Sequence, residues 1–101
     1  MNFVKVASTK DLSSGKMMEI KVGGKEILIV NLAGKYYAIE NSCTHRSCKL
    51  SDGILKGGSV KCPCHGSIFD IKTGNVIKSP AKKATPTFQV KTEEDQILIK
   101  V

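Results

Sequence analysis

Apolar and polar residues alternate along short stretches in both end regions of the chain, and this period of two predicts β-strands. The stretches are separated by turn residues, among them the Gly23-Gly24 pair, which suits a two-residue hairpin turn. No stretch sustains the apolar repeat of about 3.6 residues that an amphipathic helix requires. The chain is therefore predicted to be all-β, as a small antiparallel sandwich or barrel. The predicted strands cover residues 3–7, 16–22, 26–32, 36–40, 59–62, 67–71, 87–92 and 96–101.

Three further features are predicted between and beside these strands. Thr9-Lys10-Asp11-Leu12 forms a brief turn or one helical turn capped by Thr9. The last two strands form a hairpin over Glu93-Glu94-Asp95. Residues 41–75 are rich in Gly, Ser, Cys and His, so we interpret them as an insert between the strands that flank them. With 101 residues and no linker or repeat, the chain is predicted to be a single domain, residues 1–101.

The charge favours a protein partner over nucleic acid. The formal net charge is +7, from 16 basic and nine acidic residues, and 15 of the basic residues are scattered lysines. Arg46 is the single arginine, whereas proteins that read bases rely on arginine. We predict no nucleic-acid binding and a solvated surface that steers an acidic protein partner. No apolar run reaches the length of a signal peptide or a membrane span, so we expect a cytoplasmic protein without a membrane segment, and a monomer.

All four cysteines and both histidines lie between positions 43 and 65, in two groups that predict a metal site. The groups are Cys43-Thr44-His45-Arg46-Ser47-Cys48 and Cys62-Pro63-Cys64-His65. Haem c attachment needs C-x-x-C-H, which the second group misses by one spacer residue. A plant-type iron–sulfur cluster needs a further cysteine at position 51, where the chain has serine. A zinc site built from two Cys and two His, a catalytic Cys–His couple and purely structural disulfides remain open alternatives.

The two groups resemble the paired C-x-H and C-x-x-H motifs of Rieske-type 2Fe–2S ferredoxins. The motifs are Cys43-Thr44-His45 and Cys62-Pro63-Cys64-His65, and the segments 50–53, 65–70, 73–74 and 80–81 also resemble that family. The resemblance implies one Rieske 2Fe–2S cluster, with Cys43 and Cys62 on one iron and His45 and His65 on the other. It also implies a Rieske-type antiparallel β-sandwich or barrel with a small cluster-binding subdomain inserted at about residues 41–75.

The resemblance also implies roles for residues beside the ligands. Cys48 and Cys64 would form a disulfide that joins the two ligand loops, as in the disulfide-bearing, soluble branch of the family, and such a bond suggests a thermophilic or archaeal source. Ser67 would donate a hydrogen bond to a cluster sulfide, and Phe69 stands where high-potential members carry tyrosine. The remaining positions expected close to the cluster are Pro63, which stiffens its loop, Gly66, which permits close approach, and Pro80, which packs over the cluster.

The predicted function is a soluble one-electron carrier that shuttles electrons between redox proteins and is not itself an enzyme. Its expected partners are a reductase and an electron acceptor. The first alternative is the ferredoxin component of a multicomponent oxygenase of the type that hydroxylates aromatic rings. The disulfide counts against that alternative, because most oxygenase-associated members of the family lack it. A zinc-stabilised binding domain and a redox sensor are further alternatives.

Overall fold

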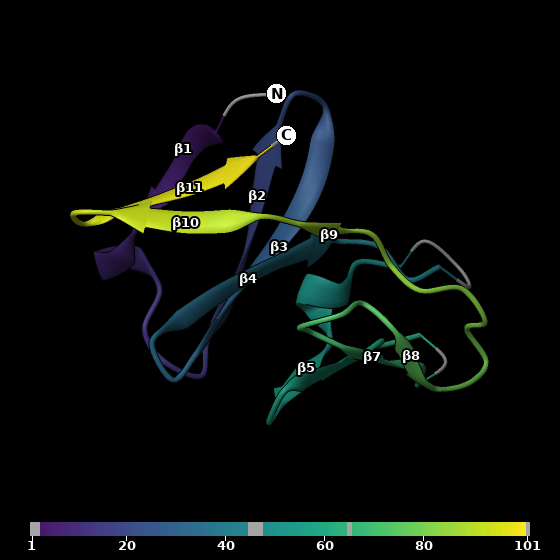
Figure 1. Cartoon of the computed structure of the whole chain (residues 1–101). Coiled ribbons are helices and arrows are strands. Elements are labelled where there is room, and N and C mark those ends of the chain that lie inside the picture. Colours follow the sequence, from purple (N-terminus) through teal and green to yellow (C-terminus); the bar gives the residue numbers. More distant parts are fainter. Residues whose placement is uncertain (1–2, 45–47, 65, 101) are drawn as a thin grey trace.

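The computed structural model describes residues 3–44, 48–64 and 66–100 (Figure 1). These residues form strands and two short 3₁₀ helices, which confirms the predicted all-β class. Among them, no helix has both the length and the apolar character needed to cross a membrane. In chain order the elements are β1 (Phe3–Ser8), η1 (Thr9–Asp11), β2 (Met17–Val22), β3 (Lys25–Leu32), β4 (Lys35–Glu40), η2 (Leu50–Asp52), β5 (Ile54–Lys56), β6 (Ser59–Lys61), β7 (Ile68–Asp70), β8 (Val76–Lys78), β9 (Thr87–Phe88), β10 (Val90–Glu93) and β11 (Gln96–Lys100).

The strands form three antiparallel sheets, and the cysteines lie in loops before and within the third. The end sheet has the order β1-β11-β10, the middle sheet β2-β3-β4-β9 and the ligand sheet β5-β6-β7-β8. Figure 1 shows the ligand sheet, in teal and green, at the opposite side of the molecule from β1 and β11. The ligand sheet ends at Lys78, past the predicted end of the insert at residue 75.

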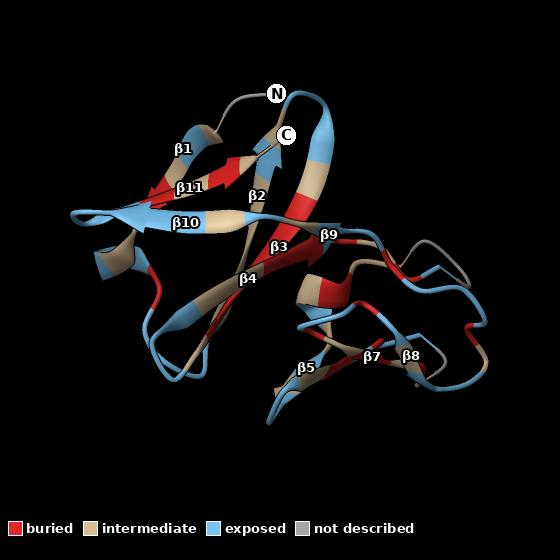
Figure 2. Ribbon diagram, viewed as in Figure 1, coloured by how far each residue is buried: buried red, intermediate tan, exposed pale blue. Residues whose placement is uncertain are grey.

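Strand β3 connects the two hydrophobic cores of the molecule. Leu28 and Val30 pack into one core, which also contains Cys43 and Cys62. Ile27 and Ile29 pack into the other core, against β11. All four side chains are fully buried, and Figure 2 shows the resulting run of buried residues along the strand. Burying each such side chain stabilises the fold by about 1.5–3 kcal/mol. The middle sheet therefore holds the ligand sheet on one face and the end sheet on the other.

The structure corrects the predicted strands in the second half of the chain. Strands β5 and β8 were not predicted, because each has only three residues and no visible alternation. The predicted strand 87–92 is two strands, since β9 pairs with β4 in the middle sheet and β10 pairs with β11 in the end sheet. The change of sheet occurs at Gln89, which lies between them. The closing turn is also shorter than predicted, because Glu93 still belongs to β10.

The turns near the N-terminus follow the sequence more closely. Gly23 and Gly24 both have positive φ, at 56° and 81°, in the hairpin between β2 and β3, as the glycine pair predicts. The helical turn at residues 9–11 is present, but its cap is Ser8 and not Thr9. The Ser8 hydroxyl accepts a hydrogen bond from the Lys10 amide at 3.2 Å, and the Ser8 amide donates to Asp11 at 3.1 Å.

Candidate metal centre

Cys43 and Cys62 are buried at the base of two neighbouring loops, which we call the first cysteine loop (43–48) and the second cysteine loop (62–67). Each of these two side chains is only 2% exposed, and both belong to the same apolar core. Backbone hydrogen bonds close each loop at its cysteine. The Cys43 amide donates to the Cys48 carbonyl at 2.8 Å, and the Cys62 amide donates to the Ser67 carbonyl at 2.7 Å. Both thiols are therefore held by closed loops, as a preorganised metal site requires.

The predicted imidazole ligands, His45 and His65, lie outside the described residues. The described part of the chain therefore places the thiol half of the predicted ligand set. That half fits an iron–sulfur cluster, because thiolate sulfur is the donor such clusters require and both thiols lie within one apolar environment.

Cys48 and Cys64 form a disulfide that joins the two cysteine loops. Their Cα atoms are 6.5 Å apart, and the two residues are separated by 16 positions in the sequence. A crosslink over a loop of this size stabilises the folded chain by about 3 kcal/mol in the chain-entropy description. The Cys62 sulfur lies beside the disulfide, since the Sγ atoms of Cys48, Cys62 and Cys64 are all within 4.8 Å of one another.

The segment after β8 lies against both cysteine loops. The Ser67 hydroxyl, which is fully buried, accepts a hydrogen bond from the Ala81 amide at 2.9 Å. At the other loop, the Thr44 hydroxyl donates to the Lys83 carbonyl at 2.7 Å. Pro80 is half-buried on this segment. It lines a shallow basin of about 510 Å³ together with Thr44, Lys82 and Lys83.

The other residues predicted beside the cluster have different environments. Phe69 is fully buried on β7, in the same core as the two buried cysteines, so it fills the space beneath the loops. Gly66 has a φ of +78°, which favours glycine, and a Cβ there would meet the Lys61 side chain at 3.5 Å. Pro63 is exposed between Cys62 and Cys64, on the rim of the site.

A buried hydrogen-bond network beside the first cysteine loop was not predicted. Asn41 is 1% exposed, and its amide group donates to Glu19 at 2.8 Å and to the Ser51 hydroxyl at 2.9 Å, while its carbonyl accepts from the Ser51 amide at 2.8 Å. Lys49 forms an ion pair with Glu19 at 3.1 Å. The hydrogen bond from Lys49 lowers the pKa of Glu19, and the same bond raises the pKa of Lys49. An isolated asparagine near a cysteine carries no sequence signal for such a network.

The fold and the site define a class of protein: a small all-β domain in which two buried cysteines lie on two loops, one after β4 of the middle sheet and one between β6 and β7. The chain belongs to the Rieske [2Fe-2S] domain family, which matches residues 2–89. It is 36% identical over 100 residues to the ferredoxin component of the naphthalene 1,2-dioxygenase/salicylate 5-hydroxylase systems of Ralstonia sp, covering 99% of this chain and 96% of that protein.

Solved structures agree with this family. The ferredoxin of carbazole 1,9a-dioxygenase from Nocardioides aromaticivorans IC177 has a TM-score of 0.93 and 28% identity, covering 98% of this chain and 97% of that one. A chain in the complex of reduced oxygenase and oxidized ferredoxin in carbazole 1,9a-dioxygenase has a TM-score of 0.90 and 30% identity, covering 96% of this chain and 91% of that one. The protein is thus an electron carrier that holds one Rieske [2Fe-2S] cluster.

Proposed function

We propose that Cys43 and Cys62 bind one iron of the cluster and that His45 and His65 bind the other. The observation that carries this assignment is the burial of both thiols in one core, on two loops that each also contain one of the histidines in sequence. When bound, the cluster supplies a one-electron couple whose potential is raised by imidazole ligands relative to an all-cysteine site. The chain acts as one domain, and the ligand sheet with its two loops is the cluster-binding part.

Isotope labelling with EPR tests the ligand assignment. Reduced protein grown with ¹⁵N-histidine should show altered nitrogen hyperfine couplings, because iron-bound imidazole nitrogen shares the unpaired spin. Cys43→Ser and Cys62→Ser should each lose the visible absorption, whereas Lys56→Ser, a matched exposed change on the same sheet, should keep it. A colourless protein that contains stoichiometric zinc would contradict the assignment.

The potential of the cluster is proposed to depend on Ser67. Its hydroxyl oxygen accepts the Ala81 amide, and a hydroxyl that accepts one hydrogen bond still has its own hydrogen to donate. Donation to a cluster sulfide would stabilise the reduced, more negative state. Ser67→Ala should therefore lower the midpoint potential measured by protein-film voltammetry. Phe69→Tyr adds a second donor in the same core and should raise the midpoint potential. Shifts in the opposite directions would show that neither side chain acts on the cluster potential in this way.

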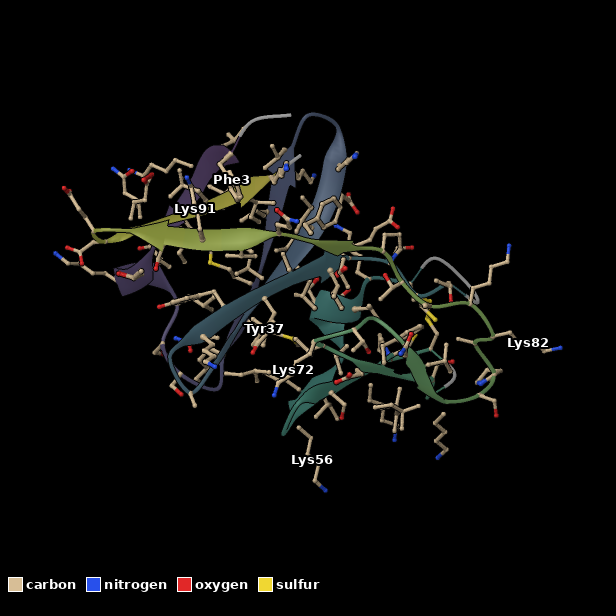
Figure 3. All side chains as sticks on the ribbon, in the orientation of Figure 1. Phe3, Tyr37, Lys56, Lys72, Lys82 and Lys91 are labelled. Atoms are coloured by element: carbon tan, nitrogen blue, oxygen red, sulfur yellow. A yellow bond between two sulfur atoms is a disulfide. The ribbon has the colours of Figure 1, made fainter. Side chains whose placement is uncertain are left out.

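The redox partners are proposed to present acidic surfaces to the ligand sheet. Its solvent side carries a row of alternating isoleucine and lysine side chains, in which Ile54 pairs with Lys61, Lys61 with Ile68, and Ile68 with Lys78. Ile54 is 64% exposed, so the row offers apolar contact area as well as positive charge. Lys82 extends away from the ribbon at the same end of the molecule (Figure 3). Complementary charge of this kind mainly accelerates association.

Matched charge reversals test this docking surface. Lys61→Glu with Lys78→Glu should slow reduction by the reductase of a naphthalene 1,2-dioxygenase system and weaken its dependence on salt. Lys5→Glu with Lys10→Glu changes the net charge by the same amount on exposed residues near the end sheet, and should leave the rate close to that of the wild type. Equal effects of the two pairs would show that only the net charge matters.

A second candidate role is the ferredoxin component of an aromatic-ring dioxygenase in the cytoplasm. The relatives named above favour it, because they are ferredoxin components of such systems. The reduced protein would then pass its electron to a terminal oxygenase, and stopped-flow mixing with the terminal oxygenase of carbazole 1,9a-dioxygenase measures this step. Reoxidation that does not depend on the oxygenase concentration would argue for another acceptor.

The expected oligomeric state is a monomer, and analytical ultracentrifugation in the same buffer tests it.

A further inference from the structure

Three of the four cysteine sulfurs gather at one point between the two cysteine loops. The Sγ atoms of Cys48, Cys62 and Cys64 lie within 4.8 Å of one another, and among the described residues this group has no fourth member. Two of the sulfurs form the disulfide, whereas the third belongs to a proposed iron ligand. A thiolate so close to a disulfide is positioned for thiol–disulfide exchange, in which it attacks one sulfur and displaces the other.

We propose that Cys62 exchanges with the Cys48–Cys64 disulfide whenever it is not bound to iron, and that the exchange withholds Cys62 from the cluster. In this step the Cys62 thiolate forms a bond to the Cys48 sulfur, the Cys48–Cys64 bond breaks, and Cys64 leaves as a thiolate that takes up a proton. One disulfide and one thiol are present before and after, so the step needs no oxidant or reductant. The consequence for the cluster rests on the proposed function, whereas the exchange itself requires only the three sulfurs.

The spacing of the three cysteines sets the direction of the exchange. Cys48 is half-buried and packs against the core that contains Cys62, whereas Cys64 is exposed. Attack on the Cys48 sulfur keeps a bond between the two cysteine loops, as the original disulfide does. A direct Cys62–Cys64 bond would also have to close a small ring across the rigid residue Pro63. The favoured product is therefore the Cys48–Cys62 disulfide with an exposed Cys64 thiol.

The exchange has a consequence for loading of the cluster. A chain whose Cys62 is in a disulfide lacks one of the two thiolates proposed for the first iron, so it cannot take up the cluster. The step is reversible, because the exposed Cys64 thiolate, or a small dithiol that reaches it, attacks the new bond. Loading of an oxidised, iron-free chain should therefore be slow by itself and faster with a dithiol, which reduces the new bond.

The Cys43→Ser variant isolates the exchange. It removes the other proposed thiolate ligand and keeps all three exchanging sulfurs, so a single thiol remains beside one disulfide. The variant is held without oxygen at mildly alkaline pH, quenched with acid at intervals, labelled with N-ethylmaleimide under denaturing conditions, and mapped by tandem mass spectrometry. The label should move from Cys62 to Cys64 within minutes to hours, while the Cys48–Cys62 peptide replaces the Cys48–Cys64 peptide.

Three comparisons make the test decisive. Cys62→Ser in the same background lacks the attacking sulfur, and Cys64 should stay unlabelled in it. A label that stays on Cys62 throughout in folded Cys43→Ser protein would overturn the proposal, and a label that appears on Cys48 would overturn its direction. In wild-type protein with an intact cluster, the label should stay off Cys64 until a chelator removes the iron. Exchange at the same rate with the cluster intact would refute the ligand role of Cys62 and leave the exchange itself standing.

Discussion

Replacing Asn41 by alanine should destabilise the whole protein, because this side chain connects the middle sheet to the first cysteine loop. The substitution removes three partly buried hydrogen bonds, to Glu19, to the Ser51 hydroxyl and from the Ser51 amide. At about 0.5–1.5 kcal/mol net for each bond, we expect a loss of about 3 kcal/mol in the free energy of unfolding. For a domain of this size, such a loss lowers the melting temperature by roughly 12–24 °C.

Urea denaturation of the holoprotein, followed by circular dichroism and by the visible absorption of the cluster, measures this loss. Asn75→Ala is the matched control, because Asn75 is exposed and its hydrogen bonds are made by its backbone. The control should change the free energy of unfolding by less than about 0.5 kcal/mol. A second comparison is Asn31→Ala, which removes two hydrogen bonds beside the other core, at Leu12 and Gly34. An effect of Asn41→Ala no larger than that of Asn75→Ala would refute the reasoning.

Two further predictions concern the same part of the molecule. Gly53→Ala would drive its new Cβ into the Lys61 carbonyl, directly before the second cysteine loop, so it should lower the urea midpoint and weaken cluster retention, whereas Gly58→Ala enters open space and should do neither. Because Lys49 lowers the pKa of Glu19, this carboxylate should stabilise the fold above its usual pKa of 4.5 and lose that contribution as the pH falls through the lowered value. Urea midpoints from pH 7 to pH 3 should therefore fall more steeply for the wild type than for Glu19→Gln, and parallel curves would contradict the coupling.

The first half of the fold was predictable because its strands are long and are separated by clear turn residues. Strand β3 has eight residues and a hydrophobic run that marks a strand buried on both faces. Strands β5 and β8 show no alternation of apolar and polar residues, whereas β6 and β7, which are equally short, lie within predicted stretches. The split at Gln89 was also hidden, because alternation along a chain does not reveal which sheet each part joins.

The site was predictable where it depends on residue type and spacing, and not where it depends on tertiary contacts. The motif singles out Cys43 and Cys62 as the proposed thiol ligands, and the structure buries these two residues in one core. The hydrogen bond between Ser67 and Ala81 joins residues 14 positions apart, and no local sequence pattern predicts it. The closeness of Cys62 to Cys64 follows from their spacing of two residues, whereas its closeness to Cys48 depends on how the two loops fold.

The disulfide therefore has opposite effects on the protein with and without iron. If Cys62 binds iron, as proposed above, the Cys48–Cys64 bond of the loaded protein would only restrain the two cysteine loops, and this restraint stabilises the folded chain. Once Cys62 is released, the same bond becomes the electrophile nearest to its thiolate. Because the bond that joins the loops lies beside Cys62, the loop geometry that would stabilise the loaded site also places Cys62 for exchange. Cluster loss and disulfide rearrangement are thus expected to occur as coupled events in this chain.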